Sequence, residues 1–158
     1  MKLKSNKSIT NFINKDIDRL APKQVVVGKP ADHFTVRNGV EFAGSHFIVD
    51  LWGAEPLDDL ALMESTLRKA VEVAGATLLH IHLHHFTPND GISGVAVLAE
   101  SHISVHTWPE RDFAAFDVFM CGDTKPELTI PIFREAFKPE KISISEHLRG
   151  VAEDSLRS

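Results

Sequence analysis

The sequence predicts a single α+β domain, a two-layer sandwich in which a mainly antiparallel sheet is covered on one face by two helices. Three observations support this fold class. The chain has 158 residues, of which 43% are hydrophobic, as expected for one globular domain. One segment shows helical periodicity and a proline opens a second expected helix, whereas most of the other segments are rich in β-formers. Short turns join several of these β segments, which favours hairpins over parallel crossovers.

The first half of the domain begins with a strand and a helix. Residues 45–52 (SHFIVDLW) alternate in polarity before Gly53 and Pro56, which predicts a strand. A helix follows, because apolar residues recur along one helical face and acidic residues precede them. That face consists of Leu60, Met63, Leu67, Ala70, Val71 and Ala74, and Gly75 ends the helix.

The second half continues with hairpin strands and a second helix. Polar turn residues, glycines and prolines separate the apolar runs. The expected order is β-α-β-β-(β)-α-β. After the first helix its elements are strand 76–86, turn 87–91, strand 92–99, extended residues 101–107, a turn at 109–112, strand 113–120, a helix from Pro126 to near Phe137, and strand 141–146.

The two ends of the chain have a different character from the centre. Residues 1–30 carry seven Lys and Arg against two Asp, and prolines interrupt the segment. We therefore expect residues 1–40 to be a loosely ordered N-terminal extension without catalytic residues, with one short helix around Ile9 to Leu20. Residues 41–150 form the expected domain, and residues 151–158 a tail.

Composition excludes several classes of protein. The net charge of −5 and the pI of about 6.0 argue against a nucleic-acid-binding protein. No apolar run approaches the length of a membrane span, and the N-terminus lacks the apolar core of a secretory signal, so we expect a cytoplasmic protein with no membrane partner. The single cysteine, Cys121, excludes an intrachain disulfide and an all-cysteine metal site.

Histidines are concentrated in the centre of the sequence. Six of the nine lie between residues 80 and 106, and His80, His82 and His84 share one face of a strand. This spacing can bind a metal. However, no Asp or Glu lies between Glu72 and Asp90 to supply a further ligand or a supporting carboxylate. We therefore favour a polar sheet face and expect no bound metal.

Three further motifs are weak when taken singly. Residues 91–94 (GISG) lack the Gly-Lys-Ser/Thr of a phosphate-binding loop, so a glycine-punctuated strand is the simpler interpretation. Ser101 and His102 are adjacent, and strand neighbours point to opposite faces, which argues against a serine hydrolase. Cys121 ends a strand, where it is either a buried structural residue or a reactive thiol.

Together these motifs form a longer pattern. The run GISGVAVLAESHISVHTWPERDFAAFDVFMCG, residues 91–122, resembles the bacterial and archaeal type of S-adenosylmethionine decarboxylase proenzyme, a pyruvoyl-dependent family that cleaves itself. The resemblance extends from about Gly44 to Gly150. It implies cleavage between Glu100 and Ser101, which gives a β chain of residues 1–100 and an α chain of residues 101–158.

The resemblance also implies a role for each catalytic residue. The Ser101 hydroxyl attacks the Glu100 carbonyl, and Ser101 then becomes a pyruvoyl group that forms a Schiff base with the substrate amine. Ser93 hydrogen-bonds the processing intermediate, and His106 removes the Cα proton, a task suited to an imidazole. Cys121 returns a proton to the substrate after CO2 leaves.

Three residues match the family's substrate-binding positions. Phe86 and Trp108 correspond to aromatic side chains that contact the adenine, and Glu110 corresponds to the acid that accepts hydrogen bonds from the ribose hydroxyls. An aromatic ring beside the sulfonium would also attract its charge. The alternative for Phe86 and Trp108 is simple packing in a core or an interface.

Strand geometry adds a constraint that the motif does not contain. Ser101 and His106 are five residues apart, so in a regular strand about 16 Å would separate them and they would point to opposite faces. They would not meet within one chain. The resemblance implies a dimer with composite sites, in which Ser101 and Cys121 come from one subunit and Ser93 and His106 from the other.

The function implied is decarboxylation of S-adenosylmethionine, which yields the aminopropyl donor for spermidine and polyamine synthesis. The main alternative is a pyruvoyl-dependent arginine or ornithine decarboxylase on the same fold, which would lack the adenosine contacts. Two other classes are an unprocessed paralogue that regulates an active partner and a histidine-rich metal-binding module.

Overall fold

The computed structural model describes residues 33–152, which belong to one compact unit. The helix expected around Ile9 to Leu20, most of the predicted extension and residues 153–158 of the predicted tail lie outside the described residues. Among the described helices, none is both long and apolar enough to cross a membrane.

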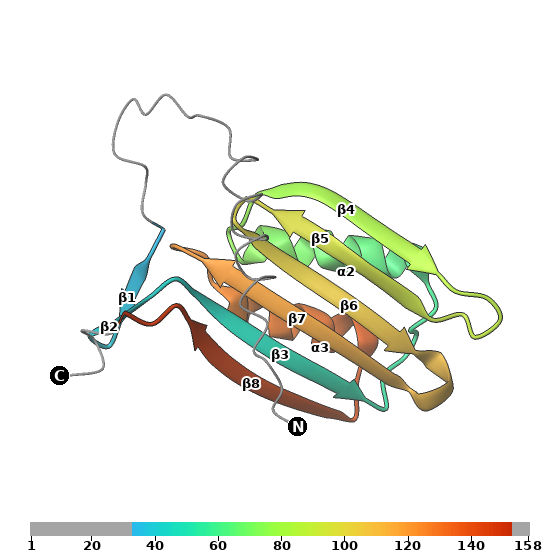
Figure 1. Ribbon diagram of the computed structural model, residues 1–158. Coiled ribbons are helices and arrows are strands. Elements are labelled where there is room, and N and C mark those ends of the chain that lie inside the picture. Colours follow the sequence, from blue (N-terminus) through green and yellow to red (C-terminus); the bar gives the residue numbers. More distant parts are fainter. Residues whose placement is uncertain (1–32, 153–158) are drawn as a thin grey trace, which may run out of the picture. The chain divides into compact units, whose positions relative to one another are not determined.

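Six strands form one antiparallel sheet, with the order β4-β5-β6-β7-β3-β8 (Figure 1). This arrangement confirms the predicted fold class and each strand expected between residues 45 and 146. It has one strand more than the predicted order, because residues 101–108 form a separate strand that pairs with β5 across the turn at residues 99 and 100. The last strand continues three residues past its predicted end at Glu146, because it pairs with β3 along its whole length. The strands are β3 (Gly44–Trp52), β4 (Leu78–His85), β5 (Ile92–Leu98), β6 (Ser101–Trp108), β7 (Phe113–Cys121) and β8 (Lys141–Arg149).

Two helices lie on the same face of this sheet (Figure 1). Helix α2 (Leu60–Val73) begins after Asp59, whose carboxylate accepts a hydrogen bond from the backbone N–H of Leu62 at 2.9 Å. This is an N-cap, which satisfies a donor that the helix itself cannot pair. Helix α3 (Thr129–Phe137) follows a short 3₁₀ turn, η2 (Pro126–Leu128), so the second helix starts at the predicted proline with a tighter turn.

The hydrophobic core lies between the helices and the sheet. Inward-facing residues alternate along the central strands, and the apolar faces of α2 and α3 pack against them. The rings of Phe116 on β7 and Phe133 on α3 stack with their centroids 4.2 Å apart, and both side chains are buried. This contact fixes α3 against the middle of the sheet.

A small hairpin precedes the main sheet and was not predicted. Strands β1 (Thr35–Arg37) and β2 (Val40–Phe42) pair around Asn38 and Gly39, which both have positive φ angles. Residues 35–40 fall within the expected extension, because their apolar side chains form no strong pattern. The dipeptide Asn-Gly is itself a hairpin signal, since both positions tolerate a left-handed backbone.

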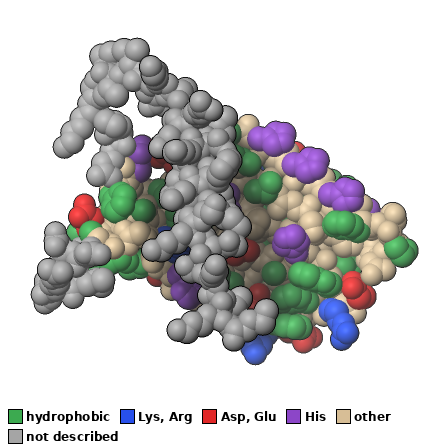
Figure 2. Space-filling view, in the orientation of Figure 1, with side chains coloured by type: hydrophobic (Ala, Val, Ile, Leu, Met, Phe, Trp, Pro, Cys, Tyr) green, Lys and Arg blue, Asp and Glu red, His purple; other side chains and the backbone are tan. Residues whose placement is uncertain are grey.

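The second face of the sheet is not covered by any element within residues 33–152 (Figure 1). Several large apolar side chains are exposed there, and Figure 2 shows hydrophobic and histidine side chains on this side. By strand alternation and register they are Ile48, Trp52, Val97 and Trp108, each about 40% exposed or more. We call this surface the open face.

Phe133→Ala should destabilise the domain by about 3–5 kcal/mol, because it deletes a buried ring and leaves a cavity beside Phe116. Ile144→Ala, at an exposed position on β8, should cost about 1 kcal/mol or less. Urea unfolding of both variants in a Ser101→Ala background, chosen to keep the chain whole, measures the difference. Equal losses for the two variants would contradict this account of the core.

Candidate active site

The register of the β5–β6 hairpin places most of the predicted catalytic residues. Leu98 pairs with Ser101 across a two-residue turn, and the same register pairs Ser93 with His106. The second turn residue, Glu100, has φ 66°, in the left-handed region that favours glycine. A side chain in that region costs about 1–2 kcal/mol. The bond predicted to be cut therefore follows a strained residue.

Ser101 and Cys121 meet at this end of the sheet. Ser101 is only 9% exposed, and its Oγ accepts a hydrogen bond from the backbone N–H of Cys121 at 3.2 Å. Gly44 pairs with Cys121 on the neighbouring strand, and a Cβ on Gly44 would lie 2.9 Å from the cysteine Sγ. Glycine at this position therefore leaves room for the thiol. We call Glu100, Ser101 and Cys121 the cleavage end.

The Cys121 thiol is half-buried and close to an acidic side chain. Burial, first, and the negative charge of Glu100, second, raise the pKa of Cys121 above its usual value. Both effects disfavour the thiolate. At neutral pH the thiol is therefore protonated and able to donate a proton, rather than activated as a nucleophile.

At the other end of the hairpin, Ser93 and His106 form a second pair. The Ser93 Oγ lies 2.8 Å from the Nδ1 of His106, and both residues belong to strands that pair directly. The hydrogen bond can run in either direction, depending on the histidine tautomer. This cross-strand pair requires no long-range packing, because the hairpin register alone brings the two residues opposite each other.

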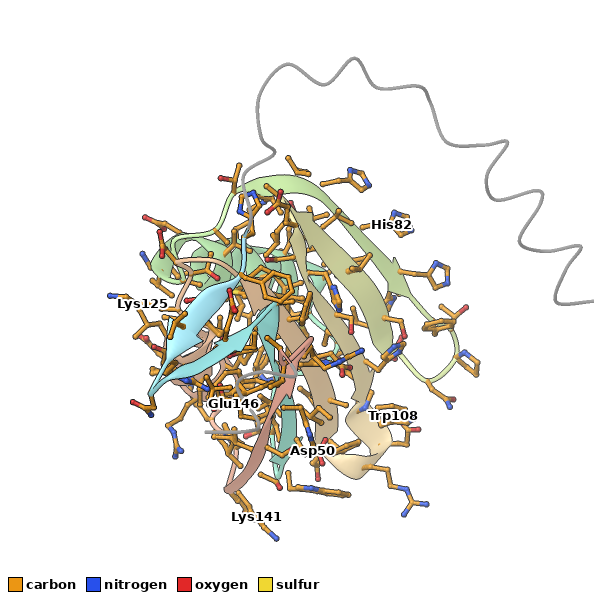
Figure 3. All side chains as sticks on the ribbon, turned by 60° about the vertical axis from the view of Figure 1, so that its left-hand side comes forward. Asp50, His82, Trp108, Lys125, Lys141 and Glu146 are labelled. Atoms are coloured by element: carbon orange, nitrogen blue, oxygen red, sulfur yellow. The ribbon has the colours of Figure 1, made fainter. Side chains whose placement is uncertain are left out.

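The predicted substrate-binding residues surround the Ser93–His106 pair. A cavity of about 330 Å³ opens here, and Figure 3 shows Trp108 at the far end of β6 from Ser101. The cavity joins the end of β4, the turn after it, the start of β5 and the end of β6. Its lining includes Phe86, Ser93, His106, Trp108 and Glu110, with Thr87, Pro88, Asn89, Gly91 and Thr107. We call it the aromatic pocket.

A buried hydroxyl supports the wall of the aromatic pocket. Thr107 Oγ1 accepts a hydrogen bond from the Ile92 N–H at 2.8 Å and donates one to the Leu57 carbonyl at 2.9 Å. Next to it, a Cβ on Gly91 would lie 2.8 Å from the Thr107 carbonyl oxygen. The start of β5 and the end of β6 are thus held together where the pocket forms.

The structure therefore divides the predicted site residues into two groups. Ser101 lies on the inward-facing side of β6, whereas His106 is exposed on the other side. Strand β6 pairs with β5 and with β7 in unbroken register, so no bulge turns one residue toward the other. Within one chain the cleavage end and the aromatic pocket are separated along the strand, as the spacing predicts.

Sequence reasoning missed two aromatic residues beside the pocket. The ring of Phe113 stacks on Trp52 with centroids 4.3 Å apart and on Trp108 at 5.3 Å. The three side chains come from β3, β7 and β6 and lie in one row across the open face. The signal for this row was strand parity, but using it required knowing that β3 pairs with β7.

The histidine row follows β4 and reaches the aromatic pocket at one end, where the His84 ring packs edge-on against the Phe86 ring with centroids 4.5 Å apart. His80, His82 and His84 are exposed along β4, an edge strand, and His82 points away from the sheet in Figure 3. Within residues 33–152 no group of three or more His, Cys, Asp or Glu is placed to hold a metal ion. The row is a polar sheet face in this structure.

A polar cluster occupies the middle of the open face. The Asp117 carboxylate lies 3.1 Å from the Nε2 of His46 and accepts a hydrogen bond from Ser104 at 3.3 Å. Burial, and then the neighbouring His46, lower the pKa of His102 below its usual value, whereas Asp117 opposes this shift. His102 is therefore neutral at physiological pH.

The family model and the sequence relatives that match this chain indicate the same family. A family model described as S-adenosylmethionine decarboxylase matches residues 45–150. The S-adenosylmethionine decarboxylase proenzyme of Thermomicrobium roseum is 45% identical over 112 residues, which are 70% of this chain and 97% of that protein. The proenzyme of Methanococcus maripaludis strain S2 is 50% identical over 114 residues, which are 70% of this chain and 93% of that protein.

A solved structure agrees with these sequence matches. The crystal structure of the adenosylmethionine decarboxylase from Aquifex aeolicus aligns with a TM-score of 0.64 and 33% identity, over 72% of this chain and 95% of that chain. The matched region contains both the cleavage end and the aromatic pocket. The chain belongs to the S-adenosylmethionine decarboxylase family.

Proposed function

We propose that this protein decarboxylates S-adenosylmethionine after cutting its own chain between Glu100 and Ser101. The observation that carries the proposal is the geometry of the cleavage end, where a nearly buried serine hydroxyl follows a left-handed residue and accepts a backbone hydrogen bond. The aromatic pocket favours an adenosine-containing substrate over the alternative, arginine or ornithine, because neither amino acid has a base to stack or a ribose to bind.

Self-cleavage uses residues that the turn already places together. The Ser101 Oγ attacks the Glu100 carbonyl carbon, the Glu100–Ser101 amide bond breaks, and an ester replaces it. Loss of the Ser101 Cα proton then expels the Glu100 carboxylate and leaves dehydroalanine, whose hydrolysis releases ammonia and gives a pyruvoyl group. The N–H of Cys121 favours the reactive, ionised form of the hydroxyl.

The resulting pyruvoyl group would sit at the start of β6, beside Cys121. Ser101 has the position and burial that this role needs. The group would supply a ketone that condenses with the substrate amine and takes up the electrons released with CO2. Cys121, whose pKa is raised, holds a proton near the reacting carbon. Phe86, Trp108 and Glu110 bind the adenosine part of the substrate.

Two copies of the chain are needed to complete each site in this proposal. His106 is the base for the Cα proton and Ser93 its partner, but both lie on the open face of the sheet, whereas Ser101 faces inward. The open face offers the dimer surface, since exposed Trp52, Trp108 and Ile48 would lose contact with water there. A two-fold axis would bring each cleavage end to the partner's aromatic pocket.

Ser101→Ala should remain a single full-length chain without decarboxylase activity, because no hydroxyl is present to attack Glu100. Intact mass and CO2 release from carboxyl-labelled substrate check both results. Wild type should give two chains that divide after Glu100. A cut Ser101→Ala chain would refute the mechanism.

His106→Ala should stall as an ester, because the base for the Cα proton is missing, and hydroxylamine should cleave that ester.

Glu100→Gln should lower the pKa of Cys121, because it removes the charge that helps to disfavour the thiolate. Alkylation by iodoacetamide as a function of pH reports this thiol alone, since the chain has one cysteine. In a Ser101→Ala background, the alkylation profile should shift to lower pH. The control Glu135→Gln makes the same charge change on α3 and should leave the profile in place. An unshifted Glu100→Gln profile would contradict the coupling.

Co-expression of Ser93→Ala with Cys121→Ala tests the shared site. In a heterodimer one site carries both changes, and the other combines Ser101 and Cys121 of the Ser93→Ala chain with Ser93 and His106 of the Cys121→Ala chain. Activity should rise well above that of either mutant homodimer, toward about half the wild-type value. Purified heterodimers without restored activity or cleavage would show that each site is built within one chain.

A further inference from the structure

His33 belongs to a part of the chain that precedes the region shared with the family. The family model begins at residue 45, whereas His33 stands just before the β1–β2 hairpin, which ends at Phe42. The family match therefore assigns no role to His33. The contacts of His33 nonetheless reach the cleavage end.

Two contacts connect His33 to both sides of the cleavage end. Its Nδ1 lies 2.8 Å from the Glu100 carboxylate. Its backbone carbonyl accepts a hydrogen bond from the Gly122 N–H at 3.2 Å. Glu100 carries the carbonyl that Ser101 attacks in the proposed mechanism, and Gly122 follows the thiol residue Cys121. His33 thus bridges the turn to be cut and the end of β7.

The small hairpin fixes the position of His33. Arg37 forms an ion pair of 2.6 Å with Glu146 on β8, and the Ala43 N–H donates to the Arg149 carbonyl at 2.8 Å. At the end of the hairpin, the Ala152 N–H donates to the Glu41 carbonyl at 2.9 Å. These contacts tie the hairpin to β8 and to the residues just after it, independently of Glu100.

We propose that His33 is a positioning residue for self-cleavage, which holds the Glu100 side chain and so fixes the turn that presents the Glu100 carbonyl to Ser101. The inference rests on the proposed self-cleavage and adds a residue to it. A turn residue with positive φ readily relaxes toward commoner conformations. An anchor on its side chain opposes that relaxation without touching the reacting atoms.

The exposure of the pair sets the size of the expected effect. Both side chains are about half exposed, at 50% and 52%, and solvent weakens polar contacts between exposed side chains. Exposed pairs of this kind change equilibria by only about two- to fivefold. His33→Ala should therefore slow cleavage by about two- to fivefold and should not abolish it.

The rate of cleavage of the full-length chain during cell-free synthesis tests the proposal. His33→Ala should be slower than wild type, and His33→Asn should recover most of the rate, because the Asn amide nitrogen takes the place of Nδ1. His82→Ala removes another exposed histidine, on β4, and should cleave like wild type. In a Glu100→Ala background, His33→Ala should cause no further slowing, since no side-chain acceptor for His33 remains at that position.

Three results would overturn the inference while leaving self-cleavage intact. The first is a His33→Ala chain that cleaves as fast as wild type. The second is a His33→Ala change that slows cleavage equally with and without the Glu100 carboxylate, and the third is a failure of His33→Asn to restore the rate. Either of the last two indicates a general effect on the fold. A wild-type chain that stays uncut would refute the proposed self-cleavage, and the inference with it.

Discussion

The pairing of Leu98 with Ser101 is the constraint on which the site depends. It fixes the register of the whole β5–β6 hairpin, and so places Ser93 opposite His106 and leaves Glu100 in a left-handed turn. A slip of one residue would turn every side chain of β6 to the other face. Ser101 would then leave the Cys121 N–H, and His106 would leave the aromatic pocket. One hairpin thus determines both halves of the candidate site.

The order of strands explains how the fold could survive a cut in that turn. Strands β3, β4 and β5 precede the Glu100–Ser101 bond, whereas β6, β7 and β8 follow it. In the sheet, β5 pairs with β6, and β3 lies between β7 and β8. The two products would therefore share three strand junctions, and α2 of one would pack beside α3 of the other. Cleavage would remove a turn and leave the ladders and the core in place.

The sequence predicts local features of this fold better than those that join distant segments. Alternation, helical periodicity and turn residues predicted each main-sheet strand and both helices, because these signals are contained within each segment. The row of Trp52, Phe113 and Trp108 was missed because it requires the pairing of β3 with β7. The contact between His33 and Glu100 joins residues 67 positions apart and has no local signature. The β1–β2 hairpin did have one, in Asn38-Gly39.

The regularity of β6 bears on whether one chain can form a complete site. A bulge between Ser101 and His106 would turn one of them to the other face, but β6 pairs without a shift on both sides. Its neighbours β5 and β7 are central strands with buried inner faces, so a bulge would disturb the core. In the proposed dimer, a second copy would instead bring its own His106 to the cleavage end, through a surface where aromatic side chains are exposed. The register that creates each half of the site thereby favours its completion by a partner subunit.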